Sequence, residues 1–183
     1  MKKVLVPLAD GFEDIEAVSI IDVLRRGEVT VITAALADEP MAMSAHGIRM
    51  ATDALLKDVI EEEYDAIILP GGGEGTENLL KCAPLLARLG RQKRDGGFVC
   101  AICAAPLVLE AADVIDEESV TCYPSCSPRM GRRIADVPVI ADGQLITGRG
   151  PGAATLFALV ILASLEGHKT AHNVANGMLA EFA

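Results

Sequence analysis

The stretch from Gly97 to Ala112 reads GFVCAICAAPLVLEAA and contains a predicted strand, a cysteine and a predicted helix in direct succession. Its apolar run from Phe98 to Ile102 is typical of a buried parallel strand. A helix is predicted to open directly afterwards, with Pro106 in its first turn, where a missing N–H costs little. Cys103 lies at the join, beside the N–H groups of a helix N-terminus, which lower a thiol's pKa. The pattern fits an activated thiolate, and it also fits a buried structural cysteine.

The composition describes one globular domain spanning residues 1–183, with 51% hydrophobic and 23% charged residues. A net charge of -10 argues against nucleic acid or an anionic membrane as partner, and 3% aromatics without Trp leave no stacking platform for single strands. We expect a cytoplasmic protein, because the first residues lack the apolar stretch of a signal peptide and no helix is long enough to span a bilayer. In that compartment the five cysteines are expected to be thiols.

Strands and helices are predicted to alternate along the chain. Strands are expected at residues 3–9, 29–34, 64–69 and 98–102, with short ones at 48–51, beside the second strand, and at 119–122. Helices are expected at 13–26, 53–60, 77–81, 84–93, 104–112, 153–165 and 171–182, with a loop at 36–45, a helical turn at 128–134 and a hairpin around Asp142-Gly143. The alternation implies a parallel sheet with helices on both faces, whose ligands bind at the carboxyl ends of the strands.

Two loops of unusual composition follow strands of this sheet. The segment from Asp10 to Glu16 is acidic, which either charge-balances a helix start or supplies a carboxyl for proton transfer. The segment from Gly71 to Gly75 fits neither a dinucleotide fingerprint nor a Walker loop. It is either a plain turn or a place where backbone N–H groups approach a reacting oxygen.

The remaining cysteines and histidines favour structural interpretations. Cys100 forms a CxxC with Cys103 but falls inside the strand, which favours a core thiol over a redox pair. A zinc site would also need Cys122 and Cys126 to converge with them, and we expect no metal. His168 and His172 share a helical face in a polar segment, where a solvated surface is favoured over a metal pair. His46 is the one plausible catalytic imidazole.

Four segments together resemble the ThiJ/PfpI superfamily, within it the branch of the Parkinsonism-associated protein deglycase and bacterial ThiJ-like proteins. They are ADGFEDIEA near the start, LPGGG after the third strand, AICAAP at the elbow and TGRGPGAATLFAL near the end. The resemblance covers nearly the whole chain. It implies a flavodoxin-like three-layer α/β sandwich, usually a homodimer, with the cysteine at a strand-to-helix nucleophile elbow.

The resemblance also implies roles for particular residues. Cys103 would be the reactive cysteine and Glu16 its protonated carboxyl partner. The backbone amides of Gly72 and Ala104 would form the oxyanion site. A list of expected pocket residues completes the set: Arg149, Gly150 and Pro151, together with Tyr123 and His46.

Two departures from the family pattern narrow the chemistry. Ala104 stands where the protease-like branch has a histidine, so we do not expect a peptidase. Tyr123 stands where the deglycase branch often has a pocket histidine, and His46 lies near the position of an arginine that the partner subunit can supply. Whether His46 replaces either group is left open.

The expected function is that of a cofactor-independent cysteine enzyme acting on small reactive aldehydes, glyoxalase- or deglycase-like, converting methylglyoxal to lactate. The alternative is a redox-sensing or chaperone-like stress protein that acts through oxidation of Cys103. The ThiJ name also suggests a role related to thiamine biosynthesis, which no residue here supports.

Overall fold

The computed structural model describes residues 1–182, and its centre is a sheet with strand order β5-β2-β1-β6-β7-β9-β8. Six strands run parallel, and β8 runs antiparallel to β9 at one edge. The strands are β1 (Lys3–Leu8), β2 (Thr30–Ala35), β5 (Ala54–Leu55), β6 (Ala66–Leu69), β7 (Phe98–Ile102), β8 (Val139–Asp142) and β9 (Leu145–Gly148). The predicted mostly parallel α/β sheet is therefore confirmed.

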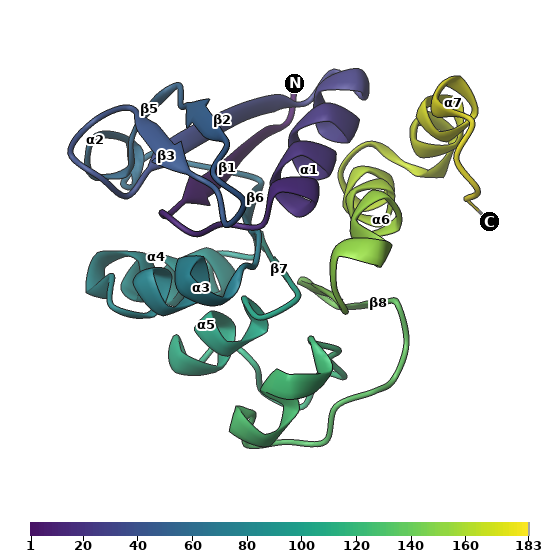
Figure 1. The fold of residues 1–183 in the computed structure, drawn as a ribbon. Helices are drawn as coiled ribbons and strands as arrows, with labels where there is room; N and C mark the ends of the chain where they lie inside the picture. The colour runs from purple at the N-terminus through teal and green to yellow at the C-terminus, as the bar shows by residue number, and fades with distance from the viewer. Residues whose placement is uncertain (183) are drawn as a thin grey trace.

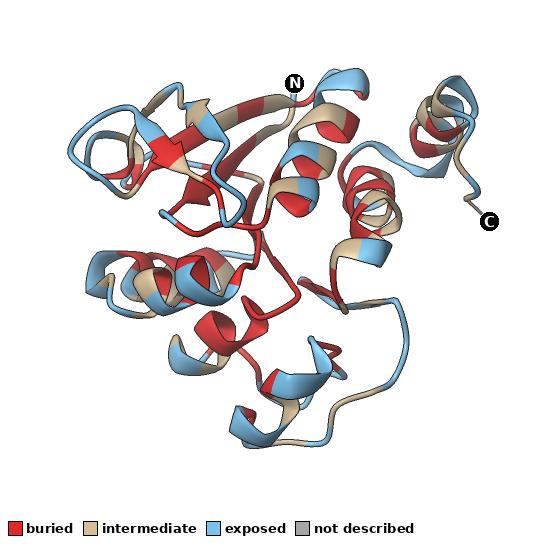
Figure 2. Ribbon diagram, viewed as in Figure 1, coloured by how far each residue is buried: buried red, intermediate tan, exposed pale blue. Residues whose placement is uncertain are grey.

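Helices cover both faces of this sheet (Figure 1). On one face α1 (Asp14–Arg26) packs beside α6 (Ala154–Glu166), and α7 (His168–Met178) packs against α6. On the other lie α3 (Gly73–Leu80), α4 (Ala83–Arg94) and α5 (Pro106–Ala111). Buried residues concentrate on the strands and on the helix sides that face them (Figure 2). Among residues 1–182, none of the helices has both the length and the apolar character that crossing a membrane requires.

The segment between β2 and β6 differs from its prediction. The expected loop at 36–45 contains β3 (Met41–Met43), which pairs with β4 (Arg49–Ala51) in a separate hairpin. The strand expected at 48–51 therefore does not lie beside β2, whose edge is taken by β5. The helix expected at 53–60 shrinks to α2 (Leu56–Val59), because the Asp53 carboxylate accepts hydrogen bonds from Thr33 instead of capping a helix.

Two further predictions between β7 and β8 are wrong. Residues 119–122 form no strand, because β9 already has β7 on one side and β8 on the other. The Thr121 N–H donates instead to the side chain of Thr147 at 3.0 Å. The helical turn expected at 128–134 lies earlier, as the 3₁₀ helix η1 (Pro124–Arg129). The hairpin around Asp142-Gly143 is confirmed, with Gly143 at a φ of 58° that favours glycine.

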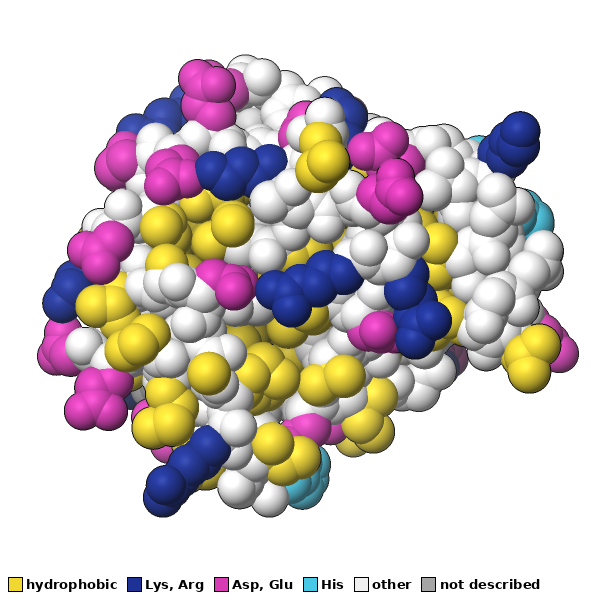
Figure 3. All heavy atoms as spheres, turned by 90° about the horizontal axis from the view of Figure 1, so that it is seen from above, with side chains coloured by type: hydrophobic (Ala, Val, Ile, Leu, Met, Phe, Trp, Pro, Cys, Tyr) yellow, Lys and Arg dark blue, Asp and Glu magenta, His cyan; other side chains and the backbone are white. Residues whose placement is uncertain are grey.

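Helix α1 buries some of its apolar side chains and exposes others. Ala17, Ile20 and Leu24 are buried, whereas Ile15 is 57% and Val18 51% exposed. These two side chains are three residues apart and lie on one side of the helix. Hydrophobic side chains gather in the middle of the face seen in Figure 3, among scattered charged groups.

Candidate functional site

Cys103 occupies a sharp turn between β7 and α5. Its φ is 65°, a left-handed conformation that costs a non-glycine residue energy and is held here by neighbouring segments. Its N–H donates to Gly148 O at 2.9 Å, and its carbonyl accepts from Tyr123 N at 2.7 Å. The thiol is 8% exposed. The strand-to-helix elbow therefore exists, although the first helical residue is Pro106 rather than Ala104.

Glu16 brings a carboxyl to the same place from the first turn of α1. The residue is fully buried, and its backbone N–H donates to the Glu13 carboxylate, which caps the helix. Its Oε2 accepts the Gly71 N–H at 2.7 Å. A Cβ built on Gly71 would lie 2.7 Å from Cys103 Cβ and 2.8 Å from Glu16 Oε2. Glycine at this position thus lets the thiol and the carboxyl approach each other across the chain.

Burial is the main influence on the Glu16 carboxyl. It raises the pKa of Glu16 from 4.5 to about 7, against the lowering effect of hydrogen bonds from the Gly71 N–H and the Cys103 thiol. The Glu13 charge raises it further. The second oxygen, Oε1, is buried without a well-formed hydrogen bond among residues 1–182. A proton on Oε1 would let this oxygen donate, while Oε2 keeps its bond from Gly71.

The thiol's own pKa is raised, not lowered as the helix N-terminus alone predicts. Burial, followed by the charge of ionised Glu16, raises the pKa of Cys103 to about 12. The backbone N–H groups of Gly72 and Ala104 donate toward the sulfur and lower it. The two side chains form a coupled pair, which loses its first proton near neutral pH. Glu16 has the lower pKa of the two, so the first negative charge lies on its carboxylate, and the thiolate form of Cys103 requires this carboxyl to keep its proton.

Gly72 combines a special conformation with close contacts. Its φ is 95°, and an added Cβ would lie 2.2 Å from Gly11 O. Only glycine therefore fits, and the backbone hydrogen bond of its N–H to the sulfur lowers the pKa of Cys103.

A shallow cleft of about 430 Å³ lies beside Tyr123, whose N–H donates to Cys103 O, although Cys103 and Glu16 do not line it. Its lining includes four of the predicted pocket residues, namely Tyr123, Arg149, Gly150 and Pro151. Tyr123 itself is 45% exposed. Arg149 Nη1 pairs with Asp136 at 2.7 Å, so its charge is already engaged on the outer side.

His46 lies outside this cleft, in the loop of the β3–β4 hairpin. Its Nδ1 is 2.6 Å from Asp14 Oδ2, and the bond to Asp14 raises its pKa. Glu13, Asp14 and His46 form the one group of three potential metal ligands found within residues 1–182. Sequence reasoning missed this group because β3, which carries His46 toward the start of α1, has too few residues to show a strand pattern.

The other cysteines stay apart from the Cys103–Glu16 pair. Cys100 is fully buried within β7, and burial raises its pKa, as expected of a core thiol. Cys122 and Cys126 are also buried, and no disulfide links any cysteine in the described chain. The candidate site is thus a thiol, a carboxyl and two amide donors.

The model of the DJ-1/PfpI family matches residues 2–164. The chain belongs to this family. Protein dj-1beta of Drosophila melanogaster is 36% identical over 99% of this chain and 98% of that protein. The glutathione-independent glyoxalase DJR-1.2 of Caenorhabditis elegans is 39% identical over 90% of this chain and 88% of that protein.

Solved structures of the DJ-1/PfpI family agree with the fold. The Drosophila DJ-1beta crystal structure has a TM-score of 0.95 at 36% identity, with 99% of each chain covered. Oxidized Toxoplasma gondii DJ-1 has a TM-score of 0.94 at 34% identity, with 100% of each chain covered. The chain spans only 41% and 46% of the length of the two Arabidopsis thaliana DJ-1 homologs that it matches.

Proposed function

We propose that this DJ-1/PfpI protein is a cofactor-independent cysteine enzyme that converts small reactive aldehydes such as methylglyoxal to 2-hydroxy acids such as lactate. The observation that carries the proposal is the contact of the Cys103 thiol with the buried Glu16 carboxyl across Gly71, with two N–H groups on the sulfur. The glyoxalase relative from Caenorhabditis elegans supports the choice of substrate.

The reaction would begin when the Cys103–Glu16 pair takes its thiolate form, with the proton on the carboxyl. The sulfur adds to the aldehyde carbon and forms a hemithioacetal, whose oxygen receives a proton from Glu16. The Gly72 and Ala104 N–H groups, which contact the sulfur in the free protein, stabilise the developing oxyanion.

The later steps need no external oxidant or reductant. The Glu16 carboxylate moves the aldehyde-carbon proton to the neighbouring carbonyl carbon, and the hemithioacetal hydroxyl proton passes to the ketone oxygen. The first carbon is thereby oxidised to a thioester and the second reduced to an alcohol. Water then cleaves the thioester, releasing lactate and restoring the Cys103 thiol. The sum is methylglyoxal plus water giving lactic acid, so atoms and electrons balance without a cofactor.

Lactate formation by purified protein tests the proposal, because methylglyoxal also disappears by simple reaction with thiols and arginines. We expect many lactate molecules per protein chain in the wild type and none above background in Cys103→Ser. Cys82→Ser is the matched control, because Cys82 is partly exposed and lies at the start of α4. Equal turnover by the wild type and Cys103→Ser rejects the enzyme proposal.

A second candidate role is redox sensing at the same thiol. One peroxide would convert the Cys103 thiolate to a sulfenate and a second to a sulfinate, with one water released at each step. The unbonded Glu16 Oε1 and the two N–H groups favour this product, because together they offer hydrogen bonds to two sulfinate oxygens. Mass spectrometry after mild peroxide should find two added oxygens on Cys103 first, and earlier oxidation of Cys82 argues against this role.

We also propose that the protein forms a homodimer through the exposed apolar side of α1. Ile15 and Val18 offer apolar surface there, and Ile48, in the β3–β4 hairpin loop, is 57% exposed. Exposed apolar side chains of this kind favour association with a second copy. Sedimentation or light scattering at micromolar concentration tests the dimer independently of any activity.

A further inference from the structure

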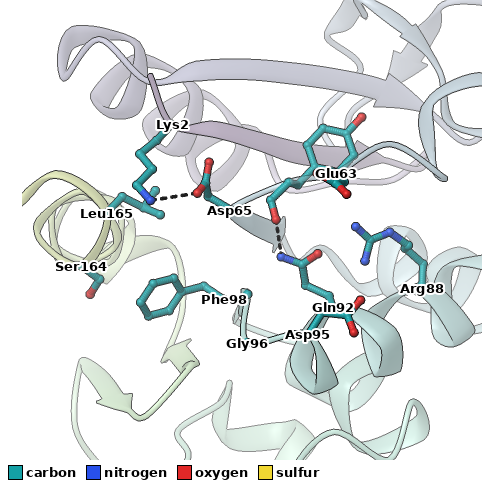
Figure 4. A pocket seen from close by; sticks show the side chains of 12 residues that line it. Lys2, Glu63, Asp65, Arg88, Gln92, Asp95, Gly96, Phe98, Ser164 and Leu165 are labelled. Atoms are coloured by element: carbon teal, nitrogen blue, oxygen red, sulfur yellow. Dashed lines mark hydrogen bonds and ion pairs between the residues drawn. The ribbon is translucent and has the colours of Figure 1, made fainter.

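A second cavity, of about 430 Å³, lies where β1, β6 and β7 begin, whereas Cys103 follows the last residue of β7. Figure 4 shows its lining. It is bordered by residues at or just before the starts of β1, β6 and β7, among them Lys2, Asp65 and Phe98, and by side chains of α4 and α6. Parallel sheets usually bind ligands at the carboxyl ends of their strands. This cavity is therefore separate from the candidate site, and its function needs its own explanation.

A buried guanidinium lines this cavity. Arg88 of α4 is 6% exposed, and its Nε and Nη2 donate to the carbonyls of Ile60 at 3.0 Å and Glu62 at 3.1 Å. Its Nη1 has no protein hydrogen-bond partner, and no carboxylate within the described residues lies at ion-pair distance from it. Nη1 does not belong to the buried polar atoms that lack a partner, so this end of the guanidinium is open to solvent in the cavity. Arg88 is thus able to accept an anionic partner.

A buried amide from the same helix lies beside it. Gln92 is 2% exposed, and its Nε2 donates to Tyr64 O at 2.7 Å. Because a carbonyl can only accept, this bond fixes the amide orientation and leaves Oε1 as an unused acceptor. Gly97 makes room for the amide, since a Cβ there would lie 2.1 Å from Nε2. Figure 4 shows Arg88 and Gln92 extending from α4 toward the same space.

The charged groups at the rim of the cavity determine whether a neutral or a positively charged hydrogen-bond donor is favoured at Gln92 Oε1. Lys2 is already paired with Asp65 at 2.9 Å, whereas the exposed carboxylates of Glu63 and Asp95 have no ion-pair partner in the described chain. Burial, followed by the charge of Arg91, lowers the pKa of Arg88, and the charges of Glu61 and Asp95 raise it in part. The cavity therefore offers a positive group at its base and negative groups at its rim.

We propose that this cavity binds a free α-amino acid, with the carboxylate on Arg88 Nη1 and the ammonium on Gln92 Oε1, facing the Asp95 carboxylate. An α-amino acid carries a carboxylate acceptor and an ammonium donor on the same carbon. These two groups match the Arg88 donor and the Gln92 acceptor. The cavity volume falls within the range of small-ligand pockets. The proposal does not depend on the chemistry of Cys103.

The test is a thermal-shift screen of the common L-amino acids at ~10 mM, followed by calorimetric titration of the best one. Its 2-hydroxy-acid analogue and the corresponding amine without the carboxylate are titrated in parallel. We expect saturable one-to-one binding of the amino acid, at least ~10-fold weaker binding of the hydroxy acid, and none of the amine. No response to any amino acid, or equal binding of the hydroxy acid, overturns the proposal.

Three variants locate the bound ligand. Gln92→Leu removes the acceptor, and Asp95→Asn removes a rim charge on an exposed residue while keeping the backbone N–H that caps α4. Both should weaken binding of the amino acid, the first by ~10-fold or more. Arg26→Gln is the matched control, because the Arg26 guanidinium pairs with Asp22 on α1 and does not line this cavity. Unchanged affinity in both Gln92→Leu and Asp95→Asn rejects this site, and methylglyoxal turnover should be equal in all of these proteins.

Discussion

Replacing Glu16 with glutamine isolates the buried carboxyl at the centre of the candidate site. Glutamine has the shape of a protonated glutamic acid. Its carbonyl oxygen can still accept the Gly71 N–H, and its NH₂ group can donate toward the Cys103 sulfur in place of the carboxyl proton. The variant should therefore keep the packing of the first turn of α1 while losing the ability to ionise.

The pKa of Glu16 sets the size of the effect on stability. Folding raises this pKa from 4.5 to about 7, so the folded chain holds the proton more tightly than the unfolded chain. Stability is therefore lost as pH rises from about 4.5 to about 7, and the loss is complete above the folded-state value. The difference between the unfolded-state and folded-state pKa of Glu16 corresponds to a loss of about 3 kcal/mol in the free energy of unfolding of the wild type. Glu16→Gln has no ionisable group at this position and does not lose this stability.

The assay is urea unfolding of both proteins at several pH values from about 4 to about 8. Other titrating groups are common to both chains and cancel in the difference. The free energy of unfolding of Glu16→Gln minus that of the wild type should increase by about 3 kcal/mol across this range, with most of the change below pH 7. Glu74→Gln, at an exposed position on α3, is the control for loss of a charge.

Parallel stability curves for the wild type and Glu16→Gln would refute the reasoning. They would mean that Glu16 ionises as easily in the folded protein as in the unfolded chain. The proton would then not be available to the Cys103 pair near neutral pH. Under the proposed mechanism Glu16→Gln also loses lactate formation by about 100-fold or more, because it cannot transfer a proton.

Other perturbations test the neighbouring contacts. Gly71→Ala should abolish lactate formation and cost about 1–3 kcal/mol in urea unfolding, whereas Gly73→Ala, with open space around it, should be nearly neutral; equal effects would contradict the packing argument. Val18→Asp should convert the proposed dimer to a monomer in light scattering, and an unchanged mass would exclude this face. Asp14→Asn should lower the pKa of His46 toward 6.5 in an NMR titration, and an unmoved pKa would mean that their contact is not kept in solution.

The sequence predicted the sheet well because buried parallel strands are continuous apolar runs. Strands β1, β2, β6 and β7 are each such a run, and each lies within two residues of its predicted bounds. The position of Cys103 was predictable for the same reason. The apolar run of β7 ends directly before this cysteine and Pro106 follows within the first helical turn, so the strand-to-helix turn falls at Cys103. A local apolar pattern is sufficient to locate a strand where both faces of that strand are buried.

Such patterns did not predict which strand, helix or second chain each segment packs against. Residues 119–122 have strand-like composition, yet the edge of β9 that they would pair with belongs to β8. Ile15 and Val18 follow a helical period, but a period cannot distinguish a core face from a face that a second chain could cover. The raised pKa of Cys103 was missed because burial against Glu16 depends on contacts between distant segments.

Strand order explains why a glycine loop separates the thiol from the carboxyl. Glu16 follows β1, Cys103 follows β7, and β6 lies between these strands in the sheet. The loop after β6 must therefore pass between the two side chains, and any side chain at Gly71 would hold them apart. The same loop places the Gly72 N–H at the sulfur. The carboxyl, the amide donors and the thiol thus converge because parallel neighbouring strands end at one edge, while the need for glycine arises from the order of those strands.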